Sequence, residues 1–254
     1  MGIFDLLTPP LAWIDNTILA SINIDVRLII WSLISAIGST LLFKWFINPQ
    51  KISVAKTQLR ASQKALNSHD GEFSELKSLA TKTIALSLKR LGLTIIPTLA
   101  ASTILVFMLV FLSSQYDLKV PEAGSRINYT ITWEEGIKNQ TIQWSDKLAN
   151  TQTTVTWPEE NTTIEMFDNQ GLKLLSIPTV PVSIIHKKQW WNVLLANPAG
   201  YIPDHSDVAY VTFEFTSKEM GPIFGAYFDT WHWPFIILLS LFSIACLIIF
   251  KVKF

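Results

Sequence analysis

Three long apolar stretches stand out along the 254 residues of the chain. No charged residue occurs in residues 28–43 or 91–116, and a third apolar stretch covers residues 231–250. A helix that crosses the hydrocarbon core of a bilayer needs about 20 residues at a rise of about 1.5 Å each. The pattern therefore predicts three transmembrane helices, at residues 27–47, 91–116 and 226–254 with a basic tail. The first includes Lys44 as a snorkelling side chain.

Charged residues are divided unevenly among the segments that flank these spans, although they sum to zero. Residues 1–26 contain three acids and no base, residues 48–90 eight bases and three acids, and residues 115–230 eight bases and fourteen acids. Because Lys and Arg are enriched on the cytoplasmic side, we expect residues 48–90 and the C-terminus inside and the N-terminus outside. This indicates an integral membrane protein, expected in a prokaryotic cytoplasmic membrane, with the long external segment periplasmic or extracellular.

The N-terminal segment, residues 1–26, precedes the first span. Leu11, Ile14 and Ile18 recur at spacings of three and four, as expected for a short amphipathic helix that lies flat at the outer membrane surface. The alternative is a flexible extramembrane tail. A cleaved signal peptide is not expected, because the segment has no basic leading region and Pro9-Pro10 interrupts its apolar part.

Residues 48–90 show helical periodicity on both sides of a short turn at residues 67–71. The apolar positions are Ile52, Ala55, Leu59 and Leu66 in the first arm, and Phe73, Leu76, Ala80 and Ile84 in the second. We predict a cytoplasmic helical hairpin that zips together as a short antiparallel coiled coil. The alternative is a pair of amphipathic helices resting on the anionic inner leaflet. The bases expected to contact partners are Lys51, Lys56, Arg60 and Lys64.

The period changes to two in the external segment, residues 117–225. Residues 126–133 and 140–144 alternate polar and apolar on either side of a turn at 134–136, which predicts a β-hairpin. Further short segments of this kind follow at 153–157, 162–166, 172–175, 182–185 and 208–215. About seven short strands predict an extracytoplasmic all-β, sandwich-like domain. A disulfide is excluded because Cys246 is the only cysteine, and three Asn-x-Thr triplets begin at Asn128, Asn139 and Asn161.

The order of these segments, with residues 27–44 leading through Asn48-Pro49 into the Lys- and Gln-rich hairpin, resembles the core of the Oxa/YidC membrane-protein insertase superfamily. It is most similar to the three-span branch, which includes the archaeal YidC-like proteins and the large core subunit of the ER membrane complex. The resemblance covers residues 1–116 and 220–254. In two respects the chain departs from the family: an external β domain replaces a hydrophobic hairpin of bacterial members, and Arg27 and Lys44 stand at the span ends, whereas the family has an arginine within the first span.

The resemblance implies an insertase with a polar intramembrane groove, which lowers the cost of moving a polar flank through lipid. Hydroxyl side chains occur in helical stripes on all three spans, at Ser32, Ser35, Ser39 and Thr40, at Thr94, Thr98 and Ser102, and at Ser240 and Ser243. The alternative is that these small residues only mediate close helix–helix packing.

Enzymatic chemistry is not expected, and we predict no catalytic residue, metal or cofactor. The four histidines are scattered without metal-ligand spacing. The cluster Asp204-His205-Ser206-Asp207 follows a proline and is typical of a solvated turn. The zero net charge gives no support to nucleic-acid binding. Of the ten tryptophans, five lie near span ends, and five lie in the β domain, where most are expected in its core: Trp133, Trp144, Trp157, Trp190 and Trp191.

The sequence therefore predicts an insertase or assembly factor that acts in the lipid bilayer. Its hairpin would contact the nascent membrane protein, the ribosome or a targeting factor, and its β domain a membrane or extracytoplasmic protein partner. The competing hypothesis is a non-catalytic scaffold or receptor subunit that acts through the β domain.

Overall fold

The computed structural model describes residues 2–135, 143–144, 153–157, 164–167, 171, 173–177 and 181–252. They form two compact units. The first, here called the β unit, comprises Met1–Asp25 and Leu109–Trp231, and the second, the helical unit, comprises Val26–Met108 and His232–Phe254. The N-terminal segment thus belongs with the external segment rather than with the first span.

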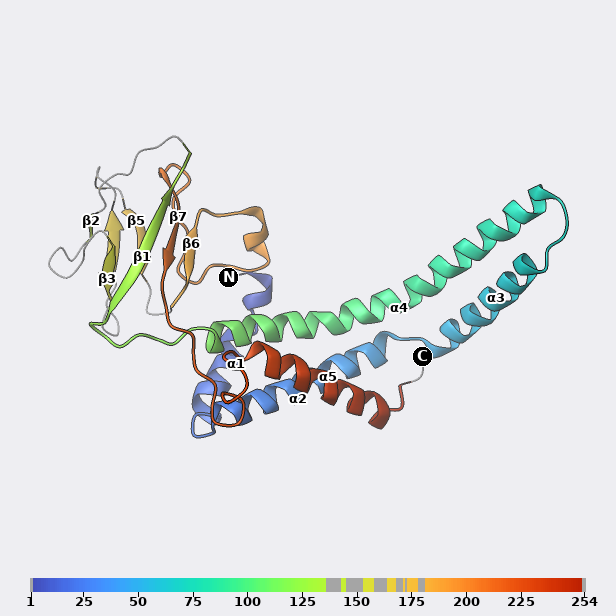
Figure 1. Ribbon diagram of the computed structural model, residues 1–254, viewed down its shortest axis with the longest axis horizontal. Helices are drawn as coiled ribbons and strands as arrows, with labels where there is room; N and C mark the ends of the chain where they lie inside the picture. The colour runs from blue at the N-terminus through green and yellow to red at the C-terminus, as the bar shows by residue number, and fades with distance from the viewer. Residues whose placement is uncertain are drawn as a thin grey trace. The chain divides into compact units, whose positions relative to one another are not determined.

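Within the described residues, three helices are long and apolar enough to cross a membrane (Figure 1). They are α2 (Ile24–Phe46), α4 (Phe73–Tyr116) and α5 (His232–Ile249). This finding suggests an integral membrane protein and agrees with the predicted helical membrane class. Helices α2 and α4 approach closely at Gly38, where an added Cβ would lie 3.2 Å from the Ile104 side chain. Lys44, near the end of α2, donates to the carbonyl of Phe250 after α5 at 3.2 Å, so these two helices run in the same direction.

Helix α3 (Pro49–Asn67) forms the first arm of the predicted hairpin. Asn48 caps it by accepting a hydrogen bond from the Lys51 N–H at 3.0 Å, and Pro49 occupies the first turn, where its missing N–H costs nothing. The side chains on its inner face are buried: Ile52, Ala55, Leu59 and Ser62. Ser62 Oγ lies 2.8 Å from Thr83 Oγ1 of α4, which joins the two arms.

The second arm of the hairpin differs from the prediction in two ways. It is continuous with the second span, because α4 runs without a break through residues 90–91 and through Pro97. The apolar face also agrees only in part: the predicted positions Leu76 and Ala80 are half-buried, whereas Phe73 and Ile84 are 78% and 61% exposed. Thr83 is half-buried beside Ile84. Since neighbouring residues on a helix point about 100° apart, the contact of Thr83 with α3 turns Ile84 outward.

A disulfide tests the pairing of the two arms. In a Cys246→Ala background, Ser62→Cys with Thr83→Cys should cross-link on mild oxidation, because the two hydroxyl oxygens already lie 2.8 Å apart and a disulfide joins sulfurs at about 2 Å. The matched pair Ala65→Cys with Thr83→Cys should not cross-link, since Ala65 is on the exposed face of α3. The readout is the shift in gel mobility on reduction after cleavage at a protease site placed in the 68–72 turn. Equal cross-linking of both pairs would contradict the hairpin.

The described strands of the β unit form two antiparallel sheets. One has the order β3-β1-β7-β6 and the other the order β2-β4-β5. Their bounds are β1 (Arg126–Trp133), β2 (Gln143–Trp144), β3 (Thr154–Thr156), β4 (Ile164–Phe167), β5 (Lys173–Ile177), β6 (Ile184–His186) and β7 (Val208–Phe213). Buried side chains of both sheets, such as Val211 and Met166, belong to one hydrophobic core. The predicted all-β, sandwich-like domain agrees with this pair of sheets.

The predicted hairpin between residues 126–133 and 140–144 is wrong. Strand β1 pairs with β3 and β7, whereas β2 pairs with β4 in the other sheet. After Trp133 the chain is held by a hydrogen bond from the Glu134 N–H to the Asp207 carbonyl at 2.9 Å. Alternation showed that each segment is a strand, but it carries no information on distant partners. Residues 140–142 lie outside the described residues.

The tryptophans of the β unit divide between core and surface. Trp157 is 4% exposed and lies in the core, and Trp133 packs against it partly buried. Trp190 and Trp191, however, are 83% and 39% exposed, so the expectation of core positions is wrong for them. Both lie in the short helix η3 (Trp190–Val193), which follows β6 and is separate from both sheets.

The N-terminal segment folds as short helical turns rather than as one regular helix. These are η1 (Ile3–Asp5), α1 (Thr8–Trp13) and η2 (Ile14–Ile18), the last with π geometry. Buried Asp15 accepts a hydrogen bond from the hydroxyl of Tyr116 at 2.9 Å. The segment is therefore folded and is not a flexible tail. Its position at the membrane surface stays a prediction.

Candidate functional site

The hydroxyl stripe of α2 is turned into the protein. Ser32 and Ser35 are fully buried, and each donates to a carbonyl four residues earlier in the helix, at 2.7 and 2.6 Å. Ser39 and Thr40 are 7% and 4% exposed, and Ser39 donates to the Ala36 carbonyl at 3.2 Å. Hydroxyls that are satisfied by their own helix need no further partner. In this structure the α2 stripe fits close helix packing and does not face an open groove.

The hydroxyls of α4 and α5 are more open. Thr98 of α4 and Ser240 of α5 are exposed, while Thr94, Ser102 and Ser243 are half-buried. Thr94, Thr98 and Ser102 each donate to a backbone carbonyl one turn earlier, at 2.9, 2.9 and 2.8 Å. Ser240 does the same towards Ile236 at 2.8 Å. These helices can therefore present hydroxyl oxygens as acceptors without leaving a donor unpaired.

The two charged residues at the ends of the first span have different surroundings. Arg27 is half-buried in the first turns of α2, and Lys44 is exposed near its end. The Lys44 ammonium donates to the Phe250 carbonyl and lies 6.0 Å from the centre of the Phe250 ring. A cation at the carbonyl end of a helix is favourable, because the carbonyls there are unpaired and carry partial negative charge. Lys44 thus joins the ends of two spans.

A cavity of about 470 Å³ lies at the base of the hairpin, between the start of α3 and the part of α4 next to the apolar span. Two lysines and apolar side chains share its wall, so it combines positive charge with hydrocarbon surface. Its lining residues are Gln50, Lys51, Val54, Ala55, Gln58, Lys89 and Leu93. We call this the hairpin-base cavity. Its volume is in the range of ligand-binding pockets, and its chemistry suits an apolar segment with an acidic flank.

The hairpin-base cavity contains one of the four bases predicted to contact partners. Lys51 lines it, whereas Lys56 is half-buried elsewhere on α3 and Arg60 and Lys64 are exposed. Sequence reasoning missed Lys89 and Leu93 as members of a site with Lys51. A signal for them was present, since an antiparallel hairpin brings together residues equally distant from its turn. Lys51 and Lys89 are both about 16 to 18 residues from the 67–71 turn.

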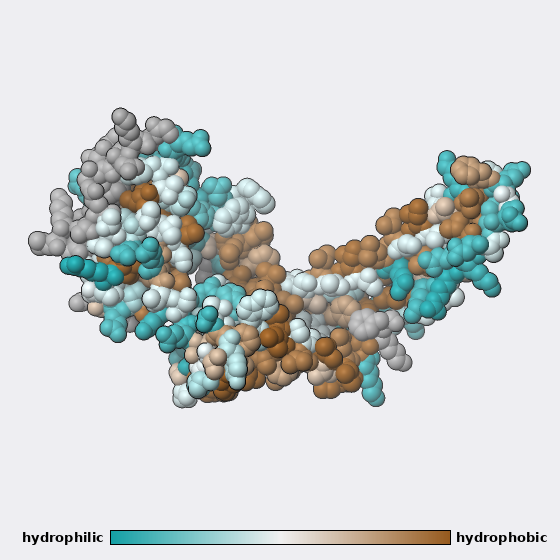
Figure 2. All heavy atoms as spheres, in the orientation of Figure 1, coloured by the Kyte–Doolittle hydropathy of each residue, from teal (hydrophilic) through white to brown (hydrophobic). Residues whose placement is uncertain are grey.

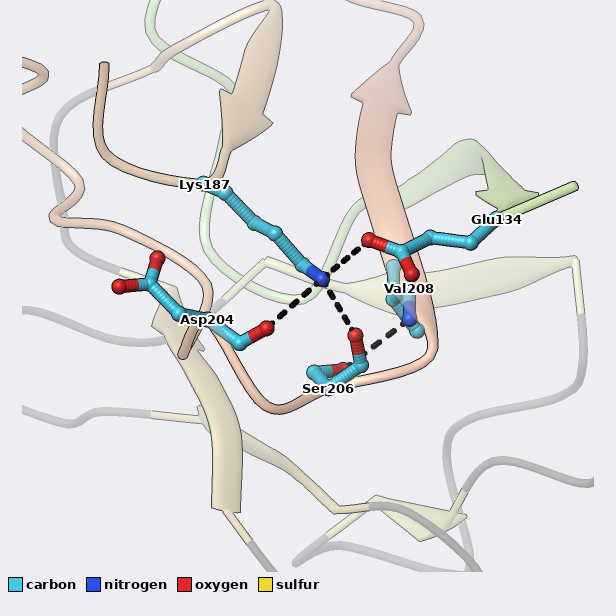
Figure 3. Close-up of polar contacts among 5 residues, drawn as sticks. All are labelled: Glu134, Lys187, Asp204, Ser206 and Val208. Atoms are coloured by element: carbon cyan, nitrogen blue, oxygen red, sulfur yellow. Dashed lines mark hydrogen bonds and ion pairs between the residues drawn. The ribbon is translucent and has the colours of Figure 1, made fainter. Parts of the chain in front are cut away.

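The polar cluster at residues 204–207 is held by Lys187 (Figure 3). The Lys187 ammonium donates to the Asp204 carbonyl at 3.0 Å and to the Ser206 carbonyl at 2.5 Å. It also pairs with the Glu134 carboxylate at 2.5 Å, and its side chain is only 15% exposed. Ser206 in turn accepts from the Val208 N–H at 3.1 Å. The contacts tie the ends of β1 and β6 to the start of β7, which is a structural role.

Replacing Lys187 should destabilise the β unit. Lys187→Met keeps the apolar stem but leaves two carbonyls and a carboxylate without their donor, so we expect a loss of about 2 kcal/mol in the free energy of unfolding. Glu134→Gln should cost less than about 1 kcal/mol, because that carboxylate is 48% exposed. Thermal unfolding of the purified protein in detergent measures both. His205→Ala, at an exposed position of the turn, should leave the midpoint unchanged. A larger effect of His205→Ala than of Lys187→Met would contradict this role.

Comparison with known proteins identifies no relative: no family model, no curated protein and no solved structure matches the chain. Among the described residues there is also no group of three or more His, Cys, Asp or Glu side chains that could hold a metal ion. Of the Asn-x-Thr triplets, Asn128 is exposed on β1 and donates to Glu214 at 3.0 Å. Asn139 and Asn161 lie outside the described residues.

Proposed function

We propose that this protein is a membrane-protein insertase or assembly factor, in which the helical unit receives a transmembrane segment of a client. The observation that carries the proposal is the hairpin-base cavity, where Lys51 and Lys89 line a hollow with Val54 and Leu93 beside the entry of α4 into its apolar span. A new transmembrane segment with an acidic flank has matching chemistry.

The outer surface of the hairpin supports the same proposal. Ile84 and Leu88 are 61% and 62% exposed although they lie in the segment with eight bases and three acids. Figure 2 shows apolar and polar side chains next to one another over this part of α3 and α4. A surface of this kind binds apolar segments without a strict sequence, since hydrophobic contact is non-directional. Such a surface can therefore bind client segments of different amino-acid sequence.

Helix α4 connects the hairpin directly to the second apolar span. One helix of 44 residues includes both the second arm and the second span. A client bound at the hairpin would therefore be held on the same helix that enters the membrane. In our proposal the exposed hydroxyls of Thr98 and Ser240 then lower the cost of a polar flank in the hydrocarbon, where a charge costs several kcal/mol. No covalent step is required.

The proposed orientation follows from charge. Residues 48–90 have a net charge of +5 and residues 115–230 a net charge of −6. Because basic segments are enriched on the cytoplasmic side, we place the hairpin in the cytoplasm. There it would contact nascent chains, a ribosome or a targeting factor. The β unit then lies on the far side of a prokaryotic cytoplasmic membrane, available to a protein partner.

Depletion in cells separates this proposal from a scaffold or receptor role. Loss of the protein should cause small membrane proteins with short translocated tails to accumulate uninserted. Lys51→Glu with Lys89→Glu, in the hairpin-base cavity, should impair complementation, and deletion of residues 120–218 should be partly tolerated. If the deletion abolishes function while the double charge reversal is silent, the protein acts through the β unit and the insertase proposal is wrong.

A further inference from the structure

The β unit has an exposed apolar surface outside its core, built by two segments far apart in the sequence. We call it the apolar patch. From the N-terminal turns it contains Ile3, Leu6 and Leu7, exposed by 49%, 58% and 45%. From the loop after β6 it contains Trp190, Val193 and Leu194, exposed by 83%, 62% and 41%. In Figure 2 apolar side chains gather beside the position that Figure 1 labels as the N-terminus. Contiguous exposed apolar patches usually mark a binding surface.

The backbone beneath the apolar patch is fixed by hydrogen bonds. The Phe4 N–H donates to the Leu194 carbonyl at 2.9 Å. The Asp5 carboxylate accepts from the N–H groups of Gly2 and Ala196, at 2.8 and 2.9 Å. Only glycine fits at position 2, since an added Cβ would lie 2.6 Å from the Leu194 oxygen. The two segments therefore form one preorganised surface.

Several polar groups of the η3 loop are bonded within the loop itself. Asn192 is 4% exposed, and its side chain accepts from the Gln189 N–H at 2.6 Å and donates to the Leu195 carbonyl at 3.1 Å. Since these polar groups are bonded internally, Trp190 and Val193 can enter an apolar environment without stranding the Gln189 N–H or the Leu195 carbonyl. The loop is thus suited to contact with hydrocarbon.

The position of the loop along α4 identifies what covers the patch. Leu195 and Pro198 share the wall of a cavity of about 710 Å³ with Leu109, Val110 and Ser113 of α4. The apolar run of α4 ends at Leu112, and Ser113-Ser114-Gln115 follow. A spanning helix leaves the hydrocarbon where its apolar run ends, and this points to the level of the lipid headgroups for the loop. Tryptophan is enriched at that level because its ring is apolar and its N–H is polar.

We propose that the apolar patch binds the surface of the lipid bilayer, with Trp190 and Val193 entering the outer leaflet at the boundary between headgroups and acyl chains. The inference rests on α4 being a membrane span and not on insertase activity. A contact with the membrane interface needs exposed apolar side chains on a backbone whose polar groups are hydrogen-bonded. The patch offers such side chains at Trp190 and Val193. A second protein is the competing occupant.

Site-directed fluorescence in the full chain tests this proposal. In a Cys246→Ala background, single cysteines Trp190→Cys and Val193→Cys are labelled with an environment-sensitive dye. Tyr210→Cys, 41% exposed on β7, is the matched control. The proteins are reconstituted into vesicles of phosphatidylcholine and phosphatidylglycerol with spin-labelled lipid, and iodide serves as the aqueous quencher. We expect lipid quenching at both patch positions to exceed that at the control several-fold, with iodide quenching in the reverse order.

The two quenchers distinguish lipid, water and protein as the surroundings of the apolar patch. If the patch dyes are quenched by iodide as strongly as the control and not by lipid, the surface is open to water and the proposal is wrong. Protection from both quenchers would indicate a protein contact, which also overturns it. Client insertion is measured in the same vesicles. If the dyes are quenched by lipid but no client is inserted, only the insertase proposal is wrong. The substitution at either exposed position leaves the core of the β unit unchanged.

Discussion

Reversing the two lysines of the hairpin-base cavity should greatly slow client insertion. Lys51→Glu with Lys89→Glu replaces positive charge by negative charge where we expect the acidic flank of the client to bind. A Lys near an anionic surface contributes about 1 kcal/mol, and 1.36 kcal/mol changes a rate by a factor of ten. We therefore expect at least about a tenfold slower insertion. Protease protection of a client with an acidic translocated tail, in vesicles that contain the purified variant, measures the rate.

The chain offers a matched control for this charge reversal. Lys77 and Lys82 line a separate shallow surface of α4, between the hairpin turn and the hairpin-base cavity. Lys77→Glu with Lys82→Glu changes the net charge of the hairpin by the same amount. It should leave the rate within about twofold of the wild type. Equal losses in the two variants would mean that only the overall charge of the hairpin matters, and the cavity would then have no specific role.

Removal of the Asp25 carboxylate should produce the largest loss of stability in the β unit. Asp25 is fully buried and accepts from the N–H groups of Gly221, Ile223 and Phe224, at 2.9, 2.7 and 3.4 Å. Asp25→Ala leaves these donors unpaired, and hydrogen bonds to a charged group contribute about 1.5–3 kcal/mol each. Because the bond from Phe224, at 3.4 Å, is long and weak, we count the other two and expect a loss of at least about 3 kcal/mol, measured as a fall of several degrees in the apparent Tm in detergent.

Two further variants make this prediction specific. Asp25→Asn keeps one acceptor oxygen and should lose less stability than Asp25→Ala. Asp229→Ala, at an exposed position before α5, removes the same charge without a buried donor and should leave the Tm unchanged. Gly221 belongs to the same contact, because an added Cβ there would lie 2.6 Å from an Asp25 oxygen. If Asp25→Ala is no worse than Asp229→Ala, the carboxylate does not hold this loop.

The elements of the fold were largely predictable because they depend on local periodicity. The uncharged stretch at 28–43 lies within α2, and alternation at 126–133 coincides with the bounds of β1. Strand pairing was not predictable, since β1 and β2 are adjacent in sequence but belong to different sheets. Which strands pair is decided by the shared core, to which residues as distant as Ile127 and Val211 contribute.

The sites were less predictable than the elements, because they depend on contacts between distant segments. The hydroxyl positions were visible in the sequence, but Ser32 and Ser35 are buried and bonded to their own helix. The role of Asp25 could not be inferred, as its donors lie almost 200 residues away in the chain. Trp190 was expected in the core because tryptophan is large and apolar, yet position on a surface loop overrides that preference.

Reconstitution tests the central claim most directly. A purified client with one transmembrane segment and a short acidic tail is presented to vesicles that contain only this protein, and to protein-free vesicles of the same lipids. The account predicts that the tail becomes protected from added protease many times faster in the first set. Equal rates in the two sets of vesicles would contradict the claim that the helical unit inserts membrane proteins.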